Sequence, residues 1–502
     1  MLLWFVIIYW IISVAIGLYA ARNVHNTRDF AVAGRHLPFY MVTATVFATW
    51  FGSETVLGIP ATFLKDGLKG VVADPFGASM CLILVGLFFA APLYRMNLLT
   101  IGDFYKKRFG RAVEVLTTIA IVLSYLGWVG AQISALGLVF NLVSDGQIST
   151  IAGMWIGSIT ILIYTFFGGM WAVAVTDLIQ MVIIVIGMLY IGGEVSGMVG
   201  GVGVVVDHAW QDGKFEFWPS FDLKAIIAFA AAWVTMMFGS IPQQDVFQRV
   251  QSAKTEKIAI WGSVLGGSLY FLFAFVPMFL AYSATLIDPQ MVTSMMNSAD
   301  PKDTQRILPR LVLEHAPLFA QVMFFGALLS AIKSCASATL LAPSVTFTEN
   351  ILKPMLGKMT DRKLLLSMRI VTLVFTVLVT LYAINSKASI FNMVENAYQV
   401  TLVAAFVPLT LGLFWRRATN QGALAAIFCG VAVWLSLLFF GGEDPFMPAQ
   451  FAGMLASFAG MIVGSLLPQI VHGPLPAEPE HAFMHHQAAK ATHHVPESPH
   501  GH

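Results

Sequence analysis

Long apolar runs separated by short polar segments make up most of the chain. A run of at least about 18 apolar residues can cross a bilayer as a helix, and by this rule the sequence holds about thirteen spans. The first, helix zero, covers residues 2–20. Helices one to twelve are expected near residues 36–62, 71–93, 113–142, 149–167, 172–193, 223–243, 258–285, 317–346, 364–384, 389–414, 421–440 and 450–469. The pattern predicts an all-α polytopic membrane protein with a transmembrane domain over residues 1–470.

The composition indicates a chain that lies mostly in lipid. Hydrophobic residues make up 57% of it and charged residues 11%, whereas soluble domains carry about a quarter charged residues. The formal net charge of +1 gives no indication of a nucleic-acid partner, and the sequence shows no sign of an obligatory protein partner. The three cysteines, Cys81, Cys335 and Cys429, lie in apolar runs without motif spacing, which argues against a disulfide framework or a thiolate metal site.

Lysine and arginine divide unequally between the two sides of the membrane. Alternating the loops places about 18 of them on one side and about 8 on the other, and the positive-inside rule makes the richer side cytoplasmic. The N-terminus is therefore expected outside and the C-terminus in the cytoplasm of a plasma membrane, which we take to be the bacterial inner membrane. The first apolar run has no basic start and is too long for a signal-peptide core, so we expect a retained helix.

Residues 471–502 differ in composition from the rest of the chain. They are rich in Pro, Ala and His, with histidines at His485, His486, His493 and His494. Such a segment could bind a metal ion. A disordered cytoplasmic tail is the preferred interpretation, because the segment has few apolar residues to bury.

Helices one and six each contain an interruption, and the two interruptions look alike. Phe51-Gly52-Ser53 precedes Gly58-Ile59-Pro60 in one, and Phe238-Gly239-Ser240 precedes Ile241-Pro242 in the other. Broken helices are tolerated in lipid only where their free carbonyls face protein or a water-filled cavity. Two broken helices five spans apart indicate an inverted repeat with a substrate and ion site at the breaks. Ordinary proline kinks in packing helices are the alternative.

Charged and polar residues inside spans need a reason, because a charge in a helix centre costs at least about 2.5 kcal/mol. Asp177 in helix five, with hydroxyls and carbonyls around it, suits a hard cation such as sodium, although a helix cap near the surface would also explain it. In helix eight, Ala331, Ser334, Ser337 and Ala338 share one face. Small residues on one face also permit close helix packing.

Lys333 lies in the middle of helix eight, too far from either end for its ammonium to reach water. It is therefore expected to pair with an acid, and Asp177 and Glu395 are the candidates. Helix ten holds a polar cluster that is expected to line a cavity or a gate. The members of that cluster are Asn392, Glu395, Asn396, Tyr398 and Gln399.

The segment after the second break offers further polar side chains. Gln243 and Gln244 could hydrogen-bond a solute, while Asp245 and Arg249 at i and i+4 suggest a surface ion pair. Three tryptophans could wall a cavity or hold a cation over a ring, although most aromatic residues in membrane helices serve packing. They are Trp50, Trp128 and Trp233.

Taken together, these residues resemble the sodium/solute symporter family, which includes the bacterial proline, sialic-acid and galactose symporters and the high-affinity choline transporter. The resemblance runs from residues 29–35 to residues 348–350. Its most specific stretches are Phe47–Thr55, Gly168–Val173 leading to Thr176, Asp177 and Gln180, and Phe247–Arg249 followed by Ser252–Lys254. Each stretch alone would be weak, and together they are specific.

The resemblance implies a leucine-transporter-type fold with a five-plus-five inverted-repeat core over residues 36–193 and 223–414. Helix zero and two extra helices over residues 421–469 are added to this core. The family's main sodium site implies carbonyls of Ala48, Phe51 and Ala331 with side-chain oxygens from Ser334 and residue 335. Cys335 departs from the usual Ser or Thr there, and a thiol is a poor ligand for a hard ion.

Some family members use a second sodium site, whose counterparts here are Asp177, Ser334, Ser337 and Ala338. Ala338 lacks the hydroxyl. We therefore consider that the Lys333 ammonium takes the place of a second cation against Asp177, which would leave one sodium ion per cycle.

The expected activity is sodium-coupled symport of a small polar solute by alternating access, with sodium as the coupling ion. The solute cavity is expected to be lined by Trp50, Glu54, Thr55, Trp128, Gln132, Gln243 and Gln244. Trp50 and Trp128 match aromatic positions of the choline transporter, whereas Gln243 replaces a tryptophan. An amino acid or another carboxylate-bearing solute suits helix N-termini and Lys333 better.

Three other functions compete with this interpretation. A proton-coupled transporter of the same fold would use Asp177 or Lys333 to carry the proton. A membrane solute sensor without transport would need a signalling domain, and the segment after the last span is too short for a kinase. An enzyme is not expected, because no Ser-His pair or His-Glu-x-x-His arrangement occurs within the spans.

Overall fold

The computed structural model describes residues 2–442 and 445–471, which form helices and an isolated backbone bridge between Leu37 and Ala253. The histidine-rich tail lies outside these residues. The first half of the chain forms α1 (Leu2–Ala20), α2 (Thr27–Val32), α3 (Phe39–Trp50), α4 (Ile59–Asp66), α5 (Ala78–Leu84), α6 (Ala90–Arg95), α7 (Ile101–Phe109), α8 (Arg111–Val143), α9 (Thr150–Met198), α10 (Val202–Gln211) and α11 (Leu223–Gly239). The second half forms α12 (Gln244–Ser252), α13 (Glu256–Ile287), α14 (Pro289–Met296), α15 (Ile307–His315), α16 (Leu318–Phe347), α17 (Lys353–Leu356), α18 (Asp361–Asn385), α19 (Ile390–Thr401), α20 (Val407–Phe414), α21 (Asn420–Phe440) and α22 (Ala449–Leu466).

The described residues contain 10 helical segments long and apolar enough to cross a membrane, or up to 11 with one bent pair. The sequence predicted about thirteen spans by length. With the bent pair counted, the difference is two spans, and each arises where predicted spans join: Glu54–Arg95 contains the end of helix one and helix two, and α9 contains helices four and five. The 49 residues of α9 would extend about 70 Å at 1.5 Å per residue, more than twice the roughly 30 Å of a hydrocarbon core. Helices four and five are thus both present within α9.

Gly169 bends α9 at the junction of the two predicted spans. Its backbone is left-handed, at φ 47° and ψ −139°, a region open mainly to glycine. A Cβ at this position would lie 2.4 Å from the carbonyl oxygen of Phe30. The Gly168-Gly169 pair therefore allows α2 to pack closely against the bend.

Both predicted helix breaks are present. The first half-helix, α3, ends at Trp50, and Phe51 leaves the helical region with φ −85° and ψ 70° before the chain resumes towards α4. In the second repeat, α11 ends at Gly239 and α12 begins at Gln244, with a bend of 47° between them. The shared Phe-Gly-Ser sequence therefore marks the same structural event twice.

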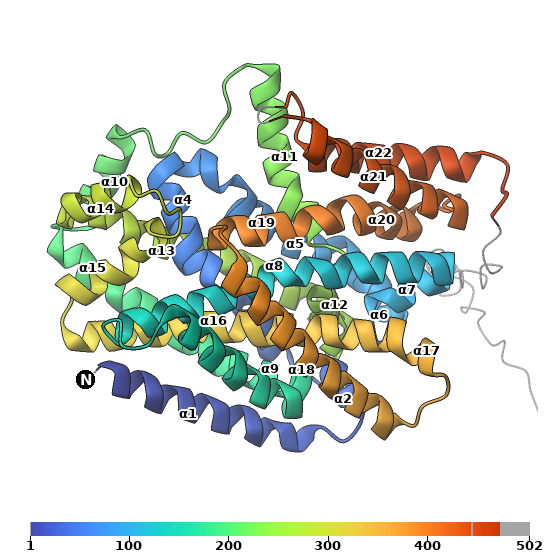
Figure 1. Ribbon diagram of the computed structural model, residues 1–502, viewed down its shortest axis with the longest axis horizontal. Helices are drawn as coiled ribbons and strands as arrows, with labels where there is room; N and C mark the ends of the chain where they lie inside the picture. Colours follow the sequence, from blue (N-terminus) through green and yellow to red (C-terminus); the bar gives the residue numbers. More distant parts are fainter. Residues whose placement is uncertain (1, 443–444, 472–502) are drawn as a thin grey trace, which may run out of the picture.

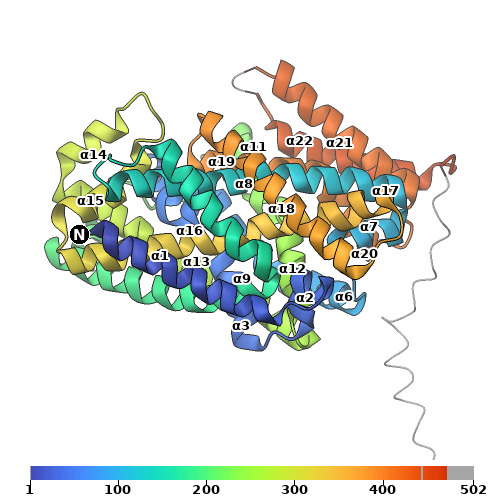
Figure 2. The same ribbon diagram turned by 60° about the horizontal axis from the view of Figure 1, so that its bottom comes forward.

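The long helices pack into a bundle in which α16 lies in the middle (Figure 1). It contacts α3, α8, α9 and α18. Helix α1 runs along one edge of the bundle against α9 and α16, and the pair α21 and α22 lies towards the opposite edge (Figures 1 and 2). The residues of α16 from Ala327 to Thr346 are buried, so any polar group among them must find its partner inside the protein.

Candidate functional site

Asp177 is the centre of a polar cluster that joins three helices. Its side chain is fully buried in α9. Thr45 Oγ1 of α3 donates to Oδ2 (2.5 Å), and Ser334 Oγ of α16 donates to Oδ1 (2.6 Å). Asp177 therefore does not cap a helix start, which was the alternative interpretation. Carboxylate and hydroxyl oxygens gathered in this way are the ligands that hard cations use.

The end of α3 supplies backbone oxygens near this cluster. The last helical bond of α3 runs from the Phe51 N–H to the Phe47 carbonyl (2.9 Å), and the carbonyls that follow lack helical partners. The Trp50 carbonyl accepts from Thr55 Oγ1 (3.1 Å). Ala48 and Phe51, the two predicted carbonyl ligands, lie in this segment and are fully buried.

The two predicted side-chain ligands on α16 point to different neighbours. Ser334 turns to Asp177, whereas Cys335 Sγ lies 3.9 Å from Glu54 Oε1. Gly52 in the break fits directly against Cys335, because a Cβ at Gly52 would lie 2.9 Å from both Cβ and Sγ of that residue. The other predicted helix-eight residues, Ala331, Ser337 and Ala338, are fully buried. Ser337 Oγ donates to the Ser334 carbonyl of its own helix (3.1 Å).

Glu54 lies in the first break and forms the second centre of the site. Its side chain is 2% exposed. Oε2 accepts from Gln132 Nε2 (2.6 Å) and Oε1 from Trp128 Nε1 (3.3 Å), both in α8. Gln132 Oε1 in turn accepts from the Ser53 N–H (2.9 Å). The side chain of Gln132 thus bonds both a free amide of the break and the carboxylate one residue later.

Aromatic rings pack beside Glu54. Trp50 and Trp128 meet edge to face with centroids 5.3 Å apart, and Tyr398 of α19 lies 6.0 Å from Trp50 and 5.4 Å from Trp128. The Tyr398 hydroxyl has no hydrogen-bond partner among the described residues. All three rings are buried, so in this conformation the site is closed to solvent. The third tryptophan named from the sequence, Trp233, packs elsewhere, against Phe217 and Phe229.

The predicted surface ion pair between Asp245 and Arg249 is not present, because both side chains are buried. Arg249 Nη1 donates to the Asp245 carbonyl (3.0 Å), and Nη2 donates to Thr49 Oγ1 of α3 (2.8 Å). The Asp245 carboxylate accepts from the Tyr125 hydroxyl (2.5 Å). The second half-helix is therefore tied through Arg249 to the first.

Of the three predicted solute-binding glutamines, the two in the second break, Gln243 and Gln244, do not contact Glu54 through a hydrogen bond. Gln243 Nε2 donates to Ser124 Oγ (2.9 Å) and Thr401 Oγ1 (3.3 Å), which places it between α8 and α19. Gln244 Oε1 accepts from the Ile101 N–H at the start of α7 (2.8 Å). Gln244 therefore joins the second break to α7.

Lys333 does not meet an acid in this structure. Its Nζ lies 4.5 Å from the ring centroid of Trp10 and 5.6 Å from those of Tyr9 and Tyr164. No hydrogen-bond partner for Nζ occurs among the described residues. The predicted pair with Asp177 or Glu395 is wrong for this conformation, because the side chain points to α1, where aromatic rings surround the ammonium at cation–π distances.

The predicted helix ten begins with α19 in the structure, and only part of its polar cluster lines a cavity. A cavity of about 420 Å³ extends between α4, residues 296–305 and the start of α19, and Asn392 lines it together with Thr62, Lys65 and Asp66. Asn396 and Gln399 instead bond one another, and Gln399 accepts from Trp434 of α21. Gly58 lets the first break pack closely against α19, since a Cβ there would lie 3.2 Å from the Phe391 amide nitrogen.

The structure also reveals site residues that the sequence analysis missed. Asp74 is buried and accepts a hydrogen bond from the hydroxyl of Tyr270 of α13, which lies 3.3 Å from Thr55 Oγ1. An acid inside the apolar start of helix two was a signal that could have been noticed. The roles of Thr45, Thr49 and Tyr270 had no such signal, because hydroxyls are common in membrane helices.

The sequence matches a known family. The model of the sodium:solute symporter family matches residues 30–430 of the chain. The human high affinity choline transporter 1 is 26% identical over 466 residues, covering 89% of this chain and 77% of that protein. A sodium/glucose cotransporter of Vibrio parahaemolyticus is 24% identical over 490 residues, covering 91% and 89%.

Two solved structures resemble the fold. A substrate-bound outward-open sodium-coupled sialic acid symporter superposes with a TM-score of 0.80 at 20% identity, covering 94% of this chain and 99% of that chain. MhsT in complex with L-phenylalanine gives a TM-score of 0.54 at 14% identity, covering 85% and 97%. At these identities the likeness concerns the fold.

Proposed function

The chain belongs to the sodium:solute symporter family, and from this premise we propose that it imports a small polar solute together with sodium by alternating access. The matched family and relatives are transporters, so the proposal involves no catalysis. The transporting part is residues 1–470, with the N-terminus outside the plasma membrane and residues 471–502 in the cytoplasm.

One observation supports the proposal most: Asp177 collects hydroxyls from α3 and α16 beside the free carbonyls of a broken helix. A bound sodium ion would replace the hydroxyl protons as the partner of these oxygens. We assign the carbonyls of Ala48, Phe51 and Ala331 and the hydroxyl of Ser334 to sodium. Asp177 accepts a hydrogen bond from Ser334, and Thr45 donates to the other oxygen of Asp177.

Cys335 fits the solute side of the site better than the sodium side. Its sulfur faces Glu54, and a thiol is a weak ligand for a hard ion. We therefore propose that sodium has one side-chain ligand fewer on α16 than in relatives with a hydroxyl there. Since Lys333 faces rings rather than Asp177, its ammonium does not replace a second cation in this conformation. The sodium-to-solute ratio of transport tests whether a second sodium ion binds at Asp177 and Ser337.

Even one sodium ion per cycle suffices for uptake. An elementary charge crossing 100 mV releases about 2.3 kcal/mol, and a tenfold sodium gradient adds about 1.4 kcal/mol. The sum corresponds to solute accumulation of several hundredfold, by the same arithmetic.

The solute is proposed to be an amino acid or a similar molecule with an amino group. Glu54 offers a carboxylate beside the rings of Trp50, Trp128 and Tyr398, and both features favour a cationic nitrogen. A monocarboxylate without an amine loses support, because Lys333 lies away from this site. A quaternary amine is the second candidate, which the three rings and the choline transporter relatives favour.

Uptake into proteoliposomes tests the coupling ion and the solute class. We expect accumulation of a labelled amino acid when a sodium gradient is imposed, and none with a proton gradient alone. Uptake driven by protons without sodium would establish the proton-coupled alternative. Sodium-dependent thermal stabilisation by solutes without any uptake would indicate a sensor.

A further inference from the structure

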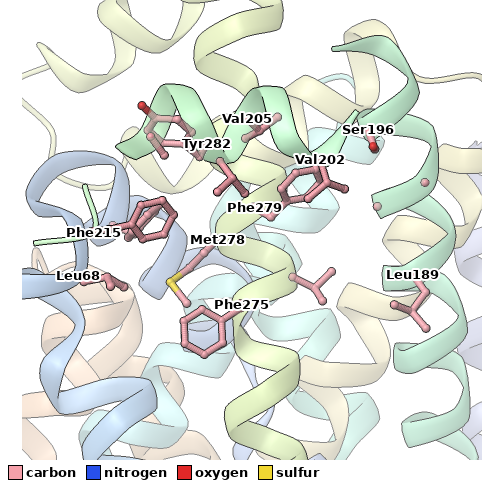
Figure 3. A pocket seen from close by; sticks show the side chains of 16 residues that line it. Leu68, Leu189, Ser196, Val202, Val205, Phe215, Phe275, Met278, Phe279 and Tyr282 are labelled. Atoms are coloured by element: carbon pink, nitrogen blue, oxygen red, sulfur yellow. The ribbon is translucent and has the colours of Figure 1, made fainter. Parts of the chain in front are cut away.

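A second cavity, separate from the site around Asp177 and Glu54, lies between α9, α10 and α13. It encloses about 500 Å³, within the roughly 300–1,000 Å³ of ligand pockets. Figure 3 shows Phe275 and Met278 of α13 on the side of Leu68 and Phe215, Leu189 of α9 on the other side of α13, and α10 with Val202 and Val205 over the space. The cavity lies at the end of the bundle that the charge count places outside.

The lining of this cavity is apolar. Its only hydroxyls belong to Ser196 and Tyr282. The Tyr282 hydroxyl is engaged elsewhere, since it lies 2.9 Å from His208 Nδ1 and donates to Asp212 Oδ2 (3.1 Å). A polar solute would therefore find only the Ser196 hydroxyl as a side-chain partner in this lining, and an apolar occupant fits better.

The rim of the cavity opens where the protein meets lipid. Leu189 is 55% exposed and Val202 54%, and the cavity is walled by α9 and α13, which are both membrane-span candidates. Glycine leaves part of the wall on α9 open: a Cβ at Gly192 would meet only Val276 Cγ1, at 4.0 Å, and one at Gly193 nothing within 4 Å. A hollow of this kind, continuous with the bilayer, is accessible to the chains of the surrounding lipid.

We propose that this cavity binds one acyl chain of a membrane phospholipid. Moving a methylene from lipid into this cavity gains no hydrophobic free energy, because both surroundings are apolar. Binding therefore depends on shape: the acyl chain makes van der Waals contacts with a lining that would otherwise lack them. The lining has no charged side chain, so the transported polar solute is not expected to bind in this cavity.

The bound chain also contacts the outer half of the first broken helix. Phe63 of α4 and Leu68 line the cavity, and Leu68 donates its N–H to the Lys214 carbonyl (2.8 Å) while Lys214 Nζ donates to the Leu64 carbonyl (2.7 Å). The segment next to Phe215 is thus bonded to the end of α4. If α4 moves during transport, as the proposed function requires, the acyl chain stabilises one of its positions.

Photo-crosslinking tests the binding without any need for transport. The full-length protein is reconstituted in vesicles containing a phosphatidylcholine with a diazirine near the end of one acyl chain, and labelled peptides are mapped by mass spectrometry. We expect concentrated labelling of Phe275–Tyr282, above that of lipid-facing α18, where Leu366 is 53% exposed. The Gly192→Phe variant fills the cavity and should lose this label while α18 keeps its own.

Gly197→Phe is the matched control. Gly197 lies on the same helix, and a Cβ there also meets nothing within 4 Å, but it does not line the cavity, so its labelling should equal that of the wild type. Labelling of Phe275–Tyr282 that matches α18 and survives Gly192→Phe would overturn the proposal. So would a label on these residues that disappears only when two copies of the chain associate, since the cavity would then belong to a protein interface.

Discussion

The two broken helices share a Phe-Gly-Ser sequence but differ in what surrounds them. The first break presents free carbonyls, the Glu54 carboxylate and a glycine that fits against Cys335 of α16. In the second break, Gln243, Gln244 and Asp245 are hydrogen-bonded to α7, α8 and α19, and Arg249 reaches back to α3.

The difference indicates a division of labour within the inverted repeat. The first break offers oxygens that a cation or an amine can use. In the second break, Gln243, Gln244 and Asp245 each bond a neighbouring helix, which ties those helices together in this conformation. The repeated Phe-Gly-Ser sequence therefore locates both breaks, but it does not mean that both have the same function.

The largest effect is expected from removing Asp177, the acid that joins α3, α9 and α16. Asp177→Asn removes the charge that two hydroxyls now stabilise, and hydrogen bonds to charged groups contribute about 1.5–3 kcal/mol each. A loss of about 3 kcal/mol would raise the half-saturating sodium concentration roughly a hundredfold. Sodium-dependent uptake rates measure this.

Ser337→Ala is the control for Asp177→Asn, because Ser337 is equally buried but its hydroxyl donates to the Ser334 carbonyl of its own helix rather than to Asp177. It should leave sodium affinity close to that of the wild type. Equal losses in the two variants would mean that Ser337 takes part in binding a cation.

Substituting the glycine of each Phe-Gly-Ser sequence, Gly52 and Gly239, allows the two breaks to be compared directly. A Cβ at Gly239 would lie 2.5 Å from the Tyr398 carbonyl oxygen, which is backbone and cannot move aside, so Gly239→Ala should lower stability by about 2 kcal/mol through overpacking. A Cβ at Gly52 would meet side-chain atoms of Glu54 and Cys335, at 2.6 and 2.9 Å. Gly52→Ala should therefore unfold at a higher temperature than Gly239→Ala, yet bind solute more weakly.

Thermal unfolding and the KM for solute separate these two effects. A Gly52→Ala protein that is less stable than Gly239→Ala, with an unchanged KM, would contradict the assignment of the first break to solute binding.

Glu54→Gln tests the charge that we assign to the solute's amino group. The amide keeps the size of the side chain but loses the charge-assisted hydrogen bond, which should weaken amine binding by about 1.4 kcal/mol, or tenfold in KM. The sodium dependence of uptake should stay the same. A shift in sodium affinity with no change in KM would place Glu54 at the cation instead.

The smallest effect is expected at Lys333, which lies outside both breaks. Lys333→Met keeps the apolar stem and removes an ammonium that has only rings as neighbours. The change in stability should be within about 1 kcal/mol, because replacing a buried charge by an apolar side chain of similar volume is often neutral. The sodium-to-solute ratio from paired isotope fluxes should be unchanged, and an altered ratio would show that Lys333 reaches Asp177 in another state.

The sequence by itself determined the apolar helices, the two breaks and the presence of an acid, Asp177, inside a span. These follow from rules that act locally: a helix must be long and apolar enough to cross lipid, a broken helix must hide its carbonyls in protein, and a buried carboxylate needs partners. The bounds of α1, α8 and α13 lie within a few residues of the predicted ones for this reason.

Only the tertiary structure decided which partners those groups meet. Lys333 and Ser337 share a face of α16, yet the lysine turns to rings of α1 and α9, and neighbouring Ser334 and Cys335 face different acids. The sequence placed Arg249 at the surface, whereas in the structure it is buried against α3 and bonds Thr49. Such contacts join residues far apart in the chain, and the direction of each side chain depends on the whole packing around it, which helical spacing alone does not contain.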